Sequence, residues 1–158
     1  MPSKPVTIAL LAVLLLGALP TAQALQAPSG GWHMLEVREV QVMPHGTTVI
    51  LYFSFEMDFF MKFYTWVMGS TPVEDYLMGL VIGLDGLETV SINPLGGEAT
   101  FRIPNATSYS DGWYYHTENH PLSQPVGRLR VFATVLGTNS TYYDALDAQV
   151  LPSFYYRG

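Results

Sequence analysis

The sequence predicts an α+β domain: a mostly antiparallel sheet, with a two-helix hairpin inserted after the second strand and packed on one face. Three observations support this fold class. Short apolar–polar alternations recur along the chain, two helical patterns follow one another between residues 58 and 83, and clusters of Gly, Pro, Asn and Asp separate the segments. At 158 residues and 49% apolar, the chain suits one domain with its own core.

The N-terminal residues have the three-part layout of a secretory signal peptide. Lys4 gives a basic start, residues 6–19 form an apolar run, and Ala22-Gln23-Ala24 is a small-x-small cleavage site. The run is short for a membrane span, which needs about 20 residues. We therefore expect a secretory signal peptide over 1–24, a linker over 25–31 and one domain over 32–158. An uncleaved N-terminal anchor is the alternative, and either form places the domain outside the cytoplasm.

The first two strands predict an antiparallel hairpin. Residues 32–43 alternate in part, and the change of parity near Arg38-Glu39 indicates a β-bulge or a bend. Residues 48–57 alternate throughout, and 44–47 reads as the turn between the two strands.

The segment from Asp58 to Gly69 is almost wholly apolar and predicts a helix with Asp58 as its N-cap. Its polar side chains, Asp58, Lys62 and Thr65, share one narrow stripe. We expect this stripe to face solvent and the rest of the helix to be buried within the monomer. The alternative is a residual patch that contacts a partner chain or the outer face of a membrane.

A second helix is predicted over 72–82, with Thr71 as N-cap and Glu74 completing a capping box. Strands are then expected over 87–92, 98–103, 113–116 and 126–135, with loops over 104–112 and 117–125. Residues 141–146 predict a returning strand, and a helix over 142–151 is the competing interpretation.

Composition excludes several classes of function. The formal net charge of −6 gives no electrostatic reason to bind nucleic acid or an anionic membrane surface. The absence of cysteine excludes disulfides, thiolate metal sites and cysteine nucleophiles. The sequence contains no phosphate-binding glycine motif and no G-x-S-x-G.

One short segment carries residues that a metal accepts. His116, Glu118 and His120 place two imidazoles and a carboxylate within five residues, a set that suits zinc or copper. The spacing differs from the metalloprotease H-E-x-x-H, and Pro121 argues for a loop rather than a helix. We therefore expect exposed loop histidines, no stoichiometric metal and no cofactor.

Aromatic residues and sequons provide the other candidates. The ten tyrosines include three adjacent pairs, and on a strand each pair is expected to bury one ring and expose the other. Exposed rings at Trp113, Tyr114 and Tyr115 are candidates for stacking on sugars. Two N-glycosylation sequons begin at Asn105 and Asn139, both in expected loops.

These observations favour a secreted or cell-surface envelope domain that is not an enzyme and acts through protein–protein contacts, including self-association. A carbohydrate-binding module that uses Trp113 and the tyrosines is one alternative. A secreted hydrolase with a site around His116 and His120 is another. Membrane contact is expected only through an uncleaved signal anchor.

Overall fold

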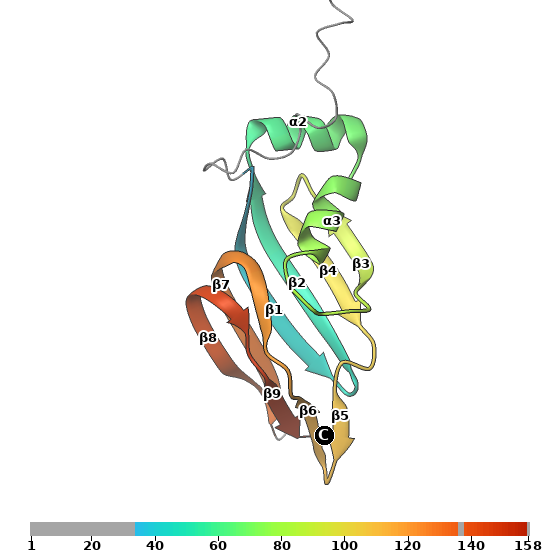
Figure 1. The fold of residues 1–158 in the computed structure, drawn as a ribbon, viewed down its shortest axis with the longest axis vertical. Helices are drawn as coiled ribbons and strands as arrows, with labels where there is room; N and C mark the ends of the chain where they lie inside the picture. Colours follow the sequence, from blue (N-terminus) through green and yellow to red (C-terminus); the bar gives the residue numbers. More distant parts are fainter. Residues whose placement is uncertain (1–33, 136–137, 158) are drawn as a thin grey trace, which may run out of the picture. The chain divides into compact units, whose positions relative to one another are not determined.

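The computed structural model describes residues 34–135 and 138–157, so the expected signal peptide and linker lie outside the described residues. Strands dominate this part of the chain, and the two helices follow the second strand, as predicted (Figure 1). The elements are β1 (Leu35–His45), β2 (Thr48–Met57), α2 (Phe59–Met68), α3 (Thr71–Met78), β3 (Glu88–Asn93), β4 (Glu98–Ile103), β5 (Ser108–Ser110), β6 (Trp113–His116), β7 (His120–Val135), β8 (Thr138–Leu151) and β9 (Phe154–Arg157).

The strands form two sheets. The larger sheet has six strands in the order β3-β4-β2-β1-β7-β8, and the smaller has three in the order β5-β6-β9. Among the described strands, every pairing is antiparallel except that of β1 with β7. The prediction of an α+β domain with a mostly antiparallel sheet is therefore confirmed.

The predicted bulge lies at Arg38 in β1. Val37 pairs with Phe55 and Glu39 pairs with Ser54, so Arg38 is the extra residue between them. On the other side of β1, Gly127 of β7 lies against the bulge, since a Cβ at Gly127 would come within 2.7 Å of the Arg38 carbonyl oxygen. The bulge thus requires a glycine on the neighbouring strand.

One face of the larger sheet carries the core. Phe53 of β2 and Phe101 of β4 meet edge to face, with ring centroids 5.5 Å apart. Val73 and Leu77 of α3 are buried in the same cluster. Within the described part of the chain, the buried apolar residues run from Leu35 to Tyr156.

The second helix is shorter than predicted. It begins at Thr71 after an N-cap at Ser70 that makes no side-chain hydrogen bond, and it ends at Gly79. Glu74 does not complete a capping box but accepts a hydrogen bond from the Thr89 hydroxyl. Leu80 and Val81 lie beyond the end of the helix but are buried in the same core. The apolar pattern therefore continues past Gly79 although the helix does not.

Some strands lie where loops were expected. β5 falls within the expected loop 104–112, and β7 begins at His120, within the expected loop 117–125. Prolines are tolerated there because β1 pairs with β7 only over 128–131 and the pairing with β8 shifts register between Pro121 and Val126. Residues 141–146 do belong to a strand, β8, so the competing helix is wrong.

Substitution of Gly127 tests the contact with the bulge. We expect Gly127→Ala to lower the free energy of unfolding by about 1–3 kcal/mol, the usual cost of overpacking, because the new methyl group meets the Arg38 carbonyl. Gly79→Ala is the matched control, since its Cβ finds only ordinary contacts and the change should be neutral or stabilise by about 0.4–1 kcal/mol. Urea unfolding measures both. Equal stability of the two variants would contradict the packing of the bulge on β7.

Candidate functional site

Helix α2 is the largest departure from the sequence-based expectation. Its N-cap is Asp58, as predicted, and the carboxylate accepts a hydrogen bond of 2.7 Å from the Met61 N–H. The helix lies across the end of the larger sheet, beyond the last residue of β2 (Figure 1). Asp58 N–H also donates to the Met34 carbonyl, 3.1 Å away, so the chain enters the domain beside α2.

Seven apolar side chains of α2 face solvent, whereas Met61 is partly buried against the core. Phe59 is 78% exposed and Trp66 is 73% exposed, whereas Thr65 is 5% exposed and is the one buried residue of the helix. The expected burial within the monomer is therefore wrong, and Thr65 marks the inner side rather than the solvent stripe. The exposed side chains are Phe59, Phe60, Phe63, Tyr64, Trp66, Val67 and Met68.

The position of α2 beyond the end of the sheet explains why its apolar side chains face solvent and Thr65 faces inward. The Thr65 hydroxyl donates to the Met57 sulfur, 3.9 Å away at the end of β2, and this contact turns the polar residue inward. At about 100° per residue, the exposed positions cover about 200° of the helix circumference. No helix among the described residues is long and apolar enough to span a membrane.

A second site lies where β6 passes to β7. His116 and His120 are 9% and 4% exposed, so the expectation of two exposed loop histidines is wrong. Their Nε2 atoms lie 3.1 Å apart, and the His116 ring stacks on Phe154 with centroids 4.9 Å apart. The Glu118 carboxylate lies 3.9 Å from the His120 Nε2.

A pocket of about 410 Å³ opens beside the histidine pair and is lined by His116, Glu118 and His120 together with Asp85. A pocket in which a histidine meets a carboxylate is what the hydrolase alternative requires. Among the described residues, the structure shows no serine or threonine hydroxyl hydrogen-bonded to either imidazole. The Thr107 hydroxyl, for example, donates to the Gly46 carbonyl instead.

The aromatic candidates for sugar stacking lie on and beside the smaller sheet. Trp113 and Tyr142 both meet Tyr155 edge-on, at interplanar angles of 67° and 70°. Tyr114 turns away and stacks on Tyr156 at 16°. These rings pack against one another and do not form the flat strip that sugar stacking favours.

Two of the three tyrosine pairs follow the predicted alternation. Trp113, Tyr114 and Tyr115 are all partly buried, so the expectation of exposed rings at these positions is wrong. Tyr155 is exposed and Tyr156 is buried, and Tyr142 is likewise more exposed than Tyr143. Burial raises the pKa of Tyr156, whose hydroxyl donates to the Gly46 carbonyl. Tyr115 is partly buried and lies 6.4 Å from the Tyr155 ring, between centroids.

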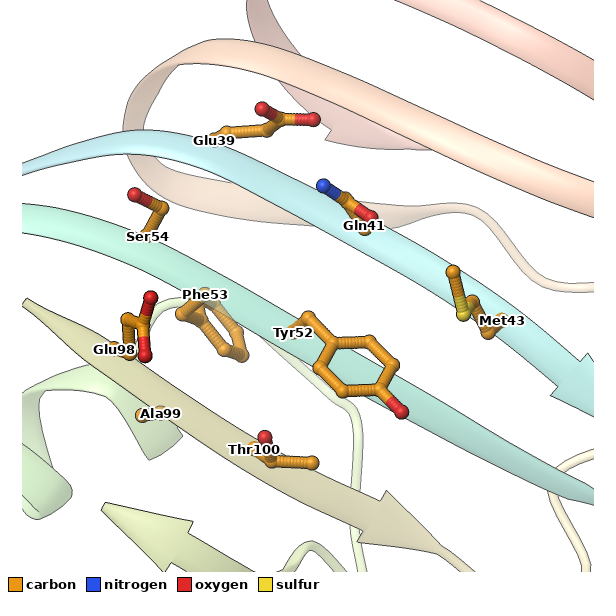
Figure 2. A pocket seen from close by; sticks show the side chains of 9 residues that line it. All are labelled: Glu39, Gln41, Met43, Tyr52, Phe53, Ser54, Glu98, Ala99 and Thr100. Atoms are coloured by element: carbon orange, nitrogen blue, oxygen red, sulfur yellow. The ribbon is translucent and has the colours of Figure 1, made fainter. Parts of the chain in front are cut away.

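The outer face of the larger sheet carries a shallow hollow of about 430 Å³ whose residues form no motif in the sequence. Figure 2 shows its polar side chains along three adjacent strands, β1, β2 and β4. Strand parity alone would have grouped them, since they are the outward partners of the buried residues. The side chains concerned are Glu39, Gln41, Tyr52, Ser54, Glu98 and Thr100.

The two sequons differ in their surroundings. Asn105 is exposed in a turn, as expected, although Thr107 of the same sequon is buried. Asn139 lies in β8 rather than in a loop. Use of either sequon stays a prediction.

Comparison with protein-family models, with curated proteins and with solved structures gives no match, so geometry alone distinguishes these sites. Of the surfaces described, α2 departs furthest from what an isolated soluble domain presents.

The outward arginines form cross-strand ion pairs, and one pair predicts a pH response. Arg128 donates to both carboxylate oxygens of Asp144, at 2.9 and 2.6 Å. These hydrogen bonds, opposed in part by burial and reinforced by the Arg128 charge, lower the pKa of Asp144 below its ordinary value. The pair therefore contributes stability above the pKa of Asp144 in the unfolded chain, and this contribution is lost as pH falls through the lowered folded-state pKa.

An NMR titration of the Asp144 carboxyl should give a midpoint below that of aspartate in an unstructured peptide. Arg128→Gln should raise the midpoint. Arg102→Gln, which removes the equivalent partner of Glu88, should leave it unchanged. A midpoint that is the same in Arg128→Gln as in the wild type would exclude the ion pair as the cause of the lowered Asp144 pKa.

Proposed function

We propose that this chain is an exported or cell-surface, non-catalytic domain that acts through protein–protein contact, with α2 as its contact surface. The observation that carries the proposal is the exposure of seven large apolar side chains on one helix of 10 residues. Soluble monomers rarely expose a contiguous apolar patch beyond a few hundred Å². We therefore infer that the exposed surface of α2 is covered by a partner molecule.

The composition of α2 is that of an interface core. Aromatic residues and methionine are enriched at interface centres, and charged residues are depleted there. Five of the exposed side chains are aromatic, and Phe63 and Trp66 contact each other with centroids 6.2 Å apart. At roughly 150–250 Å² for each buried ring, α2 offers several hundred Å², comparable to the ~800 Å² that each partner buries in a standard interface.

A second copy of the chain is the partner that suits this surface. Homodimer interfaces are more apolar than those between transient partners, and α2 is apolar over most of its exposed arc. The whole chain is acidic, with a net charge of −6, whereas the only charged side chain within α2 is Lys62. Two copies can therefore meet at α2 without opposing their acidic residues.

Sedimentation equilibrium of the processed chain, residues 25–158, tests the proposal. We expect a dimer at micromolar concentration, and we expect Phe63→Ala with Trp66→Ala to weaken it by about 100-fold or more, since hot-spot residues contribute 2 kcal/mol or more each. At concentrations where both chains are monomeric, the double variant should unfold at nearly the wild-type temperature, because both rings are exposed in the monomer.

Leu146→Ala is the matched control, since Leu146 is 74% exposed on β8 and far from α2 in the chain. It should change neither association nor stability. A wild-type chain that remains monomeric at about 100 µM, well above micromolar affinities, would refute the second copy as partner. If that monomer instead floats with lipid vesicles through Trp66, the contact surface binds lipid rather than protein.

A further inference from the structure

The buried histidine pair is independent of α2 and has its own chemistry. His116 closes β6 and His120 opens β7, so the pair lies at the connection between the two sheets. Both imidazoles are more than nine-tenths buried, yet they contact each other through ring nitrogens rather than through apolar edges. Buried polar groups in folded proteins almost always have hydrogen-bond partners, so each of these ring nitrogens needs one.

The hydrogen positions on the two rings follow from their neighbours. His116 Nδ1 lies 2.8 Å from the Ala106 carbonyl oxygen, and His120 Nδ1 lies 3.3 Å from that of Ile82. A carbonyl oxygen only accepts, so both Nδ1 atoms carry the hydrogen. A neutral imidazole has one N–H, and each Nε2 is therefore left with a lone pair.

Those two lone pairs face one another. The Nε2 atoms are 3.1 Å apart, and at this distance two lone pairs repel unless a cation lies between them. Either a shared proton or a metal ion can fill that place. Two nitrogens that bind zinc at about 2.0–2.1 Å with tetrahedral angles are about 3.3 Å apart, within a few tenths of an ångström of the observed separation.

The surroundings resemble those of a metal ligand set. Histidines that bind a metal through one nitrogen usually donate the other N–H to a backbone carbonyl or carboxylate, as both do here. No group of three or more such side chains in the described residues already surrounds one point. Glu118, however, is 76% exposed, and its carboxylate lies 3.9 Å from the His120 Nε2. A small rotation of this side chain would bring the carboxylate within bonding distance of an ion held by the two Nε2 atoms.

We propose that His116 and His120 bind one zinc ion through their Nε2 atoms, with Glu118 as the third protein ligand. Neutral imidazole and carboxylate are ligands that zinc accepts. The pocket of about 410 Å³ gives the ion a path of entry and room for a water ligand. The expectation of no metal rested on exposed loop histidines, and their burial removes that basis.

Zinc titration of the processed chain, first freed of metal by a chelator, tests the site. We expect one zinc per chain by elemental analysis after dialysis, and a rise in melting temperature with zinc, because the ion binds the folded state. His116→Gln and His120→Gln should abolish binding. Glu118→Gln should weaken it by about 10-fold or more without affecting folding, since the side chain is exposed.

His45→Gln is the matched control, because His45 is an exposed histidine, the last residue of β1, and does not line the pocket beside the histidine pair. It should bind zinc as the wild type does. Absence of stoichiometric zinc in the folded wild-type chain would overturn the proposal and leave a shared proton as the cation. Zinc that persists in both buried-histidine variants would overturn it too, and unchanged affinity in Glu118→Gln would remove Glu118 from the ligand set. None of these results depends on whether α2 forms a dimer.

Discussion

The bulge at Arg38 is the constraint on which the larger sheet depends. β1 has an antiparallel neighbour, β2, on one side and a parallel neighbour, β7, on the other. Side chains alternate along a strand, so without an extra residue the two halves of β1 would send their apolar residues to opposite faces. The bulge keeps Val37 and Val40 on the core side, and Gly127 allows β7 to approach the displaced carbonyl.

Local pattern predicted what is local in this fold. The parity change at Arg38 and the alternation of β2 predicted the first hairpin and its bulge, because a one-sided sheet repeats every two residues. The predicted limits of α3 were wrong because Leu80 and Val81 are buried in the same core without being helical. The helical spacing of apolar residues indicates which residues face the core, but it does not show where the helix ends. Here the helix ends at Gly79, before the apolar spacing does.

Features set by distant contacts escaped prediction. The apolar period of α2 is that of a core helix, and only its place beyond the end of β2 exposes it. β9 pairs with β6, about 40 residues earlier in the chain, and this pairing brings Phe154 onto His116. The histidines were recognised as a motif, but their burial depends on Ala106 and Ile82, which no spacing rule connects to them.

The hydrogen bond from Asp58 N–H to the Met34 carbonyl fixes where the chain leaves the domain, directly beside α2. Any tether attached upstream of Met34 therefore holds α2 at the tethered end. For an anchored chain, encounters between the α2 helices of neighbouring copies would be confined to two dimensions. Such confinement raises the effective concentration of each helix for the next, so an interface too weak to form in dilute solution can still assemble there.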